Sequence, residues 1–160
     1  MEEAIDLRGN KLPLSIIASE IPSLITWFNS FIGFRDIQKR IERVEAKLQG
    51  VGLDVPALNR RYYFHSTCKN LVIRNRTFGR IDIKNLNNTR AISLIAAVRN
   101  FYASLDSKQK ERLRARIIES LDPDRDIREF EHEMRAFTHY RGAGLQIIPS
   151  DEQNDGDSIL

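Results

Sequence analysis

Several residue types and motifs are scarce or missing in this sequence, and each absence excludes a class of protein. The single cysteine, Cys68, cannot form a disulfide within the chain, which favours a reducing compartment. There is no glycine-rich phosphate loop and no Gly-x-Ser-x-Gly sequence, so nucleotide hydrolases and serine hydrolases have no support. Cys68 and the three histidines form no paired metal-binding motif. We therefore expect no metal and no cofactor, and we favour a binding protein over an enzyme.

A long apolar run is also missing. The most apolar window, residues 14–34, has twelve apolar residues in twenty-one and is interrupted by Glu20, Pro22 and Asn29. A membrane-spanning helix needs about twenty nearly unbroken apolar residues. The acidic start of the chain also lacks the basic residues and apolar stretch of a secretory signal. We therefore expect a cytoplasmic protein that does not bind a membrane.

The composition that remains is typical of a folded globular protein. The chain has 160 residues, of which 41% are hydrophobic and 29% are charged. This length allows one hydrophobic core without disulfides or metal ions. We expect residues 1–149 to form one helical domain. Residues 150–160 contain four acids and are expected to form a flexible acidic tail.

Apolar residues recur at steps of three and four along most of the chain, which is the spacing of amphipathic helices. Pro22 predicts a break between two helical segments near residues 20–22. Thr89, Asp106 and Asp122 are predicted to cap the three later helices, Asp106 within a capping box. The sequence therefore predicts an all-α protein, a single compact bundle of about six helices.

The segment 71–84 allows two interpretations. Its apolar residues alternate with polar ones on both sides of Gly79, which fits a short β-hairpin. Alternatively, Ser66 caps a helix that runs to about Arg76 and is followed by an irregular loop. The helix is favoured, because a single hairpin would have no sheet to join.

Positive charge is concentrated between Arg60 and Arg90. This segment contains eight Lys or Arg and one acid, a net formal charge of +7, whereas the whole chain carries +3. Five asparagines and four aromatic rings lie among the basic residues, although burial in the core is favoured for each ring. Basic side chains bind phosphates and exposed rings stack on bases, so the leading hypothesis is a non-catalytic protein that binds RNA or DNA. The alternative is that these charges pair with acids of the chain or of a partner. The candidate nucleic-acid-binding residues are Arg60, Arg61, Lys69, Arg74, Arg76, Arg80 and Lys84.

A second hypothesis rests on a narrow apolar stripe in residues 34–51. Its apolar residues are spaced 3, 4, 3, 4 and 3, which is typical of helices that pack against one another. The stripe fits packing inside the domain. It also fits an adaptor or self-association module that binds a protein partner or forms a homo-oligomer. The candidate partner-binding residues are Ile37, Ile41, Val44 and Leu48. A basic ladder of Lys39, Arg43 and Lys47 on the same segment would extend the basic surface.

A third hypothesis rests on Arg125 and His132, which are seven residues apart on the predicted last helix and so share one face. The string from Arg125 to His132 resembles the Arg-x4-6-His signature of the HEPN ribonucleases, which are small α-helical proteins. The resemblance implies metal-independent RNA cleavage in a dimer, with the Arg and the His meeting at the subunit interface. An ordinary solvated helix face is the alternative for the same residues.

Overall fold

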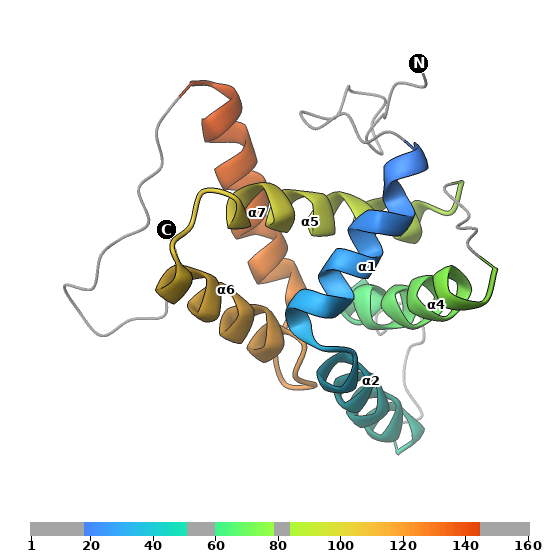
Figure 1. Ribbon diagram of the computed structural model, residues 1–160. Coiled ribbons are helices and arrows are strands. Elements are labelled where there is room, and N and C mark those ends of the chain that lie inside the picture. The colour runs from blue at the N-terminus through green and yellow to red at the C-terminus, as the bar shows by residue number, and fades with distance from the viewer. Residues whose placement is uncertain (1–17, 51–59, 79–83, 145–160) are drawn as a thin grey trace.

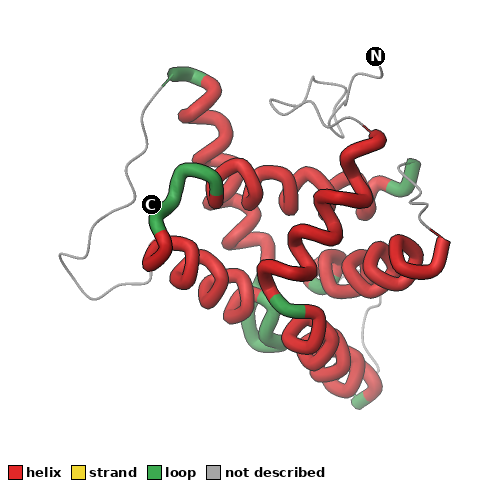
Figure 2. Tube along the Cα trace, in the orientation of Figure 1, coloured by secondary structure: helices red, strands yellow, loops and turns green. Residues whose placement is uncertain are grey.

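The computed structural model describes residues 18–50, 60–78 and 84–144 (Figure 1). Within these ranges the chain forms six α-helices and no β-strand (Figure 2). The predicted all-α bundle of about six helices is therefore confirmed. The predicted acidic tail, residues 150–160, lies outside the described residues.

The described helices are α1 (Ile21–Ile32), α2 (Phe34–Gln49), α4 (Tyr63–Phe78), α5 (Leu86–Tyr102), α6 (Ser107–Ser120) and α7 (Ile127–Gly142), with a 3-10 turn at Ala18–Glu20. Helix α1 packs against α2, α4, α5 and α6. Helix α5 packs against α1, α4 and α7, and α1 crosses it in Figure 1. Helix α2 also packs against α4, and α6 also packs against α7.

Helix α1 begins at Ile21 with Pro22 in its first turn, as predicted, whereas most of the helical segment predicted before it lies outside the described residues. It ends at Gly33, whose φ of 94° lies in the left-handed region that favours glycine. Arg114 of α6 closes this corner: its Nη2 donates to the carbonyl of Ile32 at 2.8 Å and to Asp36 Oδ2 at 2.8 Å. The guanidinium thereby satisfies a carbonyl that the end of α1 leaves unpaired. The corner thus joins α1, α2 and α6.

One of the three predicted caps is confirmed and two are wrong. Asp106 caps α6 in a capping box, in which its carboxylate accepts from the backbone N–H of Gln109 at 2.8 Å. Helix α5 is capped by Asn85 and not by Thr89, because the side chain of Asn85 accepts from the backbone N–H groups of Asn87 and Asn88. Helix α7 is capped by Asp126 and not by Asp122. In both cases an equally competent cap residue lies four positions away.

Helix α4 decides between the two interpretations of the segment 71–84 as far as Phe78. It runs unbroken to Phe78, so residues 71–78 are helical and do not form a hairpin strand. Residues 79–83 and the first part of the predicted helix at 56–64, residues 56–59, lie outside the described residues. Residues 60–61 are helical, and Tyr62 separates them from α4. Ser66, the predicted cap, lies inside α4 and donates its N–H to the carbonyl of Tyr62 at 3.2 Å. The helix begins earlier than predicted because Tyr63 and Phe64 are buried in the core and anchor its first turn.

Candidate nucleic-acid interface

The predicted nucleic-acid-binding residues lie on α4 and near its two ends. Arg60, Lys69 and Lys84 are exposed, whereas Arg61 is half-buried. Arg74 and Arg76 belong to the C-terminal half of α4, and Arg80 lies outside the described residues. Helix α4 contains three basic residues and no acid. The helix itself is therefore a positively charged element, whatever its neighbours contribute.

Lys69 forms an ion pair with Glu45 of α2. The Lys69 Nζ lies 2.5 Å from a carboxylate oxygen of Glu45, and the two side chains are 46% and 45% exposed. An ion pair at this exposure stabilises a fold by only ~0–1 kcal/mol, since water and salt screen both charges. The charge of Lys69 therefore remains available to a phosphate that competes with Glu45.

Arg61 has a structural role instead. Its Nη2 donates to the carbonyl of Asp124 at 3.1 Å, in the turn that precedes α7. The neighbouring Tyr62 is buried and donates its hydroxyl to the carbonyl of Pro123 at 2.7 Å. Together these two side chains fasten the start of α4 to the turn before α7. The expected burial of Tyr62, Tyr63 and Phe64 is confirmed, whereas the side chain of Phe78 is not described.

A buried carboxylate, which the sequence did not predict, lies where α4, α5 and α7 meet. Glu131 of α7 is 5% exposed and accepts hydrogen bonds from three side chains. Arg90 donates Nε to Oε1 at 2.8 Å and Nη2 to Oε2 at 2.6 Å. Arg135 donates Nη2 to Oε1 at 2.7 Å, and the hydroxyl of Tyr63 donates to Oε2 at 3.0 Å. The guanidinium of Arg90 also lies 4.0 Å from the centroid of the Tyr63 ring.

The electrostatics of this network keep the carboxylate ionised. Burial alone would raise the pKa of Glu131, but the hydrogen bond and charge of Arg90 and the charge of Arg135 outweigh burial, so the pKa lies below its ordinary value. Burial and the neighbouring Glu131 raise the pKa of Tyr63, so its hydroxyl stays protonated and donates. The hydrogen bond to Glu131 raises the pKa of Arg90. Tyr63 and Arg90 are thus held in the protonated states in which they donate to Glu131.

A third arginine adjoins this network. Arg128 donates Nε to Asp126 at 2.9 and 3.0 Å, and its charge repels Arg90 and attracts Glu131. We define the arginine cluster as Arg90, Arg128 and Arg135. Their side chains are 26%, 44% and 61% exposed, respectively. The cluster faces two carboxylates, those of Asp126 and Glu131, so it carries a net positive charge.

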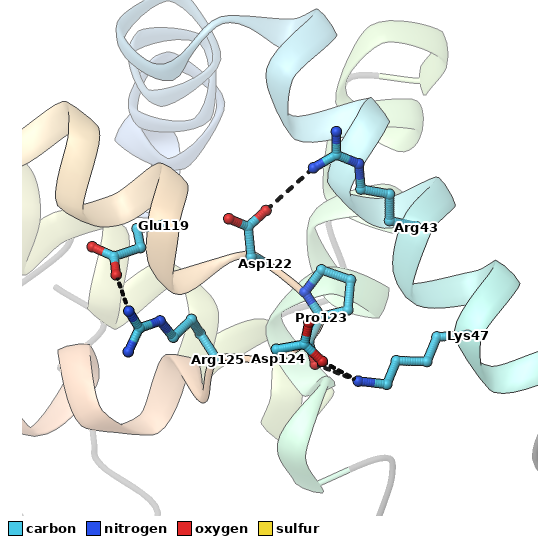
Figure 3. Close-up of a pocket in the computed structure, with 7 residues that line it drawn as sticks. All are labelled: Arg43, Lys47, Glu119, Asp122, Pro123, Asp124 and Arg125. Atoms are coloured by element: carbon cyan, nitrogen blue, oxygen red, sulfur yellow. Dashed lines mark hydrogen bonds and ion pairs between the residues drawn. The ribbon is translucent and has the colours of Figure 1, made fainter.

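The basic ladder of α2 has a different environment. Arg43 and Lys47 line a surface depression of about 710 Å³ beside the turn that precedes α7 (Figure 3). Arg43 lies 3.5 Å from Asp122, and Lys47 pairs with Asp124, whose pKa the hydrogen bond from Lys47 lowers. Arg125 lines the same depression and pairs with Glu119, so the three cations face three carboxylates. This part of the surface is close to electrically neutral.

The candidate catalytic pair is separated by the start of α7. Arg125 precedes this helix, which begins at Ile127, so the prediction that Arg125 and His132 share one helix is wrong. The turn at Asp122, whose carbonyl accepts from the N–H of Arg125 at 3.0 Å, replaces the first helical turn that the sequence predicted. His132 is exposed on α7. Among the described residues no group of three or more His, Cys, Asp or Glu is arranged to hold a metal ion.

The apolar stripe of α2 is largely covered within the monomer. Ile37, Ile41 and Val44 are buried and Leu48 is half-buried. Helix α2 packs against α1 and α4, so a partner helix would have to displace these contacts to reach the stripe. Within the described ranges, no helix combines the length and the hydropathy that a membrane-spanning segment needs.

Two further titratable groups of α4 are buried. His65 Nε2 lies 2.7 Å from the carbonyl of Leu121, and burial lowers the pKa of the imidazole. Its Nδ1 is buried and has no hydrogen-bond partner among the described residues. Burial raises the pKa of the Cys68 thiol, which disfavours the thiolate and therefore a nucleophilic role. These groups belong to the core and not to a reactive site.

A sequence signal for Glu131 existed. The inward stripe of α7 contains Ile127, Phe130, Met134 and Phe137, and position 131 lies four residues after the first and three before the third. An acid at that position is expected to be buried and to need a cationic partner.

Comparisons with protein-family models, with curated proteins and with solved structures found no match.

Proposed function

We propose that this protein is a non-catalytic helical protein that binds nucleic acid, RNA or DNA, through the sugar-phosphate backbone. The proposed contact is the α4 surface, which we define as Arg60, Lys69, Arg74, Arg76 and Lys84. One observation carries the proposal: α4 has three basic residues and no acid. The ion pair of Lys69 with Glu45 is exposed at both ends and so competes weakly with a phosphate.

The charge of the surrounding helices supports this choice of surface. On α2, Arg43 and Lys47 face Asp122 and Asp124, so the α2 ladder offers little net charge at that depression. Helix α4 contains no acid of its own, and Glu45 of α2, which pairs with Lys69, is exposed to water. A polyanion would therefore be attracted to α4 more strongly than to the α2 ladder.

The mode of binding follows from what is exposed. Tyr62, Tyr63 and Phe64 are buried in the core, so they are not available to stack on bases. The exposed amides of Asn70 and Asn87 lie among the basic residues and can hydrogen-bond to phosphate or sugar oxygens. Contacts of this kind fix the protein on the backbone without reading the sequence, so we expect binding that depends weakly on base sequence.

The test is fluorescence-anisotropy binding of a mixed-sequence single-stranded RNA and of a DNA duplex over a salt series. We expect the logarithm of the binding constant to fall linearly with the logarithm of salt, by about 0.7 per phosphate contact for a single strand and about 0.9 for a duplex. Replacing Lys69, Arg74 and Arg76 together by Ala should weaken binding and flatten this dependence. The matched control is Arg112→Ala, which removes the same kind of charge from an exposed position on α6.

Two results would contradict the proposal. Absence of binding to both probes at low salt would exclude a nucleic-acid-binding function. Cleavage of the RNA during the incubation, seen on a denaturing gel and lost in His132→Ala, would show an enzyme and favour the ribonuclease hypothesis. Intact RNA in the bound fraction is the expected outcome.

A further inference from the structure

We infer that the arginine cluster of Arg90, Arg128 and Arg135 binds a phosphate group of the nucleic-acid backbone, as a second contact distinct from the α4 surface. This inference rests on the proposed function and names an additional site for it. The three arginines come from α5 and α7, so the segment 60–90 alone does not contain the site.

The first argument is that the cluster is organised before a ligand arrives. The buried carboxylate of Glu131 holds Arg90 through Nε and Nη2 and holds Arg135 through Nη2. The Tyr63 ring lies 4.0 Å from the Arg90 guanidinium and restricts it further. Arginine side chains that are already ordered lose little conformational freedom when they bind a phosphate. Glu131 is therefore a positioning residue for this site.

The second argument is that hydrogen-bonding capacity remains unused. Arg90 and Arg128 each use Nε and Nη2 on a carboxylate, and Nη1 of each has no hydrogen-bond partner among the described residues. Arg135 uses only Nη2 within the described structure and is the most exposed of the three. Guanidinium N–H groups match phosphate oxygens in geometry and charge.

The third argument is the balance of charge. Three guanidinium groups face the two carboxylates of Asp126 and Glu131, so one positive charge is in excess. The positive charge of Arg128 opposes the rise in the pKa of Arg90, and Glu131 helps to raise the pKa of Arg128, so both guanidinium groups interact with the same carboxylate. The α2 depression differs on this point, because its three cations face three carboxylates. An excess of guanidinium over carboxylate is what a phosphate site needs.

The cluster is also placed to act together with the α4 surface. Tyr63, the first residue of α4, belongs to the Glu131 network. Helix α4 has 16 residues and is therefore about 24 Å long. This length corresponds to about seven phosphates of one duplex strand at 3.4 Å each. The N-terminal end of α4 therefore lies beside the Glu131 network that holds the arginine cluster.

The experiment compares the double variant Arg128→Ala/Arg135→Ala with wild type in the salt series, on the single-stranded RNA and on the DNA duplex. Both side chains are more than two-fifths exposed, so the fold should be retained, and circular dichroism checks this. The loss of the one phosphate contact that the cluster makes should reduce the salt slope on RNA by about 0.7 and weaken binding at moderate salt. The control is Arg112→Ala, for which the slope should change by less than that of the double variant.

A charge-conserving variant separates ligand contact from a structural role. Arg135→Lys keeps the positive charge and loses the planar fork, so it should recover most of the salt slope but not the full affinity. In parallel, the Nε–H NMR signals of Arg90, Arg128 and Arg135 should shift when RNA is added, and a merely structural cluster would leave them unchanged.

The outcomes distinguish the two proposals. If wild type binds and the α4 triple variant weakens binding, but Arg128→Ala/Arg135→Ala binds like wild type, the cluster is not a phosphate site and the α4 proposal stands. If wild type binds neither probe at low salt, both proposals are overturned. A preference for RNA or for the duplex that disappears in the double variant would assign the discrimination to the cluster.

Discussion

Two ion pairs of the basic segment show how exposure decides what a charge contributes. Arg90 and Glu131 are 26% and 5% exposed, whereas Lys69 and Glu45 are 46% and 45% exposed. In both pairs a nitrogen lies within 2.6 Å of a carboxylate oxygen. The buried pair has lost most of its water, so each member depends on the other, whereas the exposed pair can exchange partners with solvent or a ligand. The same kind of contact therefore stabilises the fold in one place and leaves a charge available in the other.

The largest expected effect on the free energy of unfolding comes from removing the negative charge of Glu131 in the buried pair. Glu131→Gln should lower the free energy of unfolding by about 3 kcal/mol, because Arg90 and the Tyr63 hydroxyl lose their charged acceptor in a buried site. Urea unfolding followed by circular dichroism measures the change. The matched control is Glu45→Gln, which removes the charge of the exposed pair and should cost less than about 1 kcal/mol. Equal losses in the two variants would contradict the comparison.

The helices could be predicted because their apolar spacing is a local property of the chain. The stripe of α7 and the capping box of α6 illustrate this, since each needs only residues within one or two turns. The exact starts of α5 and α7 were less predictable. Asn85 competes with Thr89, and Asp126 competes with Asp122, so each helix has two good caps four residues apart. In α7, Arg128 binds the carboxylate of Asp126 and so favours that cap.

The candidate site was only partly predictable, because its pairs join distant parts of the chain. The excess of basic residues between Arg60 and Arg90 is visible in the sequence. That Arg90 pairs with Glu131, 41 residues away, depends on how α5 packs against α7. Arg61 likewise contributes to the fold through the carbonyl of Asp124, 63 residues away. Sequence therefore indicates where charge accumulates, and packing decides which of those charges remain free.

Lowering the pH should remove the contributions of two buried groups, His65 and Glu131, to the free energy of unfolding in different pH ranges. Burial lowers the pKa of His65 below its unfolded value of about 6.5, so the stability it contributes is complete above that pH and falls as the pH drops below it. One proton changes the free energy of unfolding by at most about 1.4 kcal/mol per pH unit. Glu131 has a lowered pKa, so its contribution is lost only as the pH falls below about 4.3, the unfolded value for Glu.

Urea unfolding of wild type at pH 7.5, 6.5 and 5.5 should therefore show decreasing stability that His65→Gln largely removes. Glutamine retains an N–H that can donate to the carbonyl of Leu121, so the hydrogen bond is conserved while the titration is lost. The controls are His132→Gln and His139→Gln, which make the same substitution at exposed positions on α7. A pH dependence retained in His65→Gln would show that another group titrates in this range.

The exposed pair of Lys69 and Glu45 gives the smallest expected effect on stability. Its variants also separate an effect on the fold from an effect on binding. Lys69→Ala and Glu45→Ala both remove this ion pair, and each should change the free energy of unfolding by less than about 1 kcal/mol. Their effects on RNA binding should be opposite. Lys69→Ala removes one phosphate contact and should lower the salt slope by about 0.7, whereas Glu45→Ala releases Lys69 from its competitor and should strengthen binding slightly. If the two variants weakened binding equally, the ion pair itself and not the charge of Lys69 would support the interface, and α4 would present its charge to Glu45 and not to a ligand.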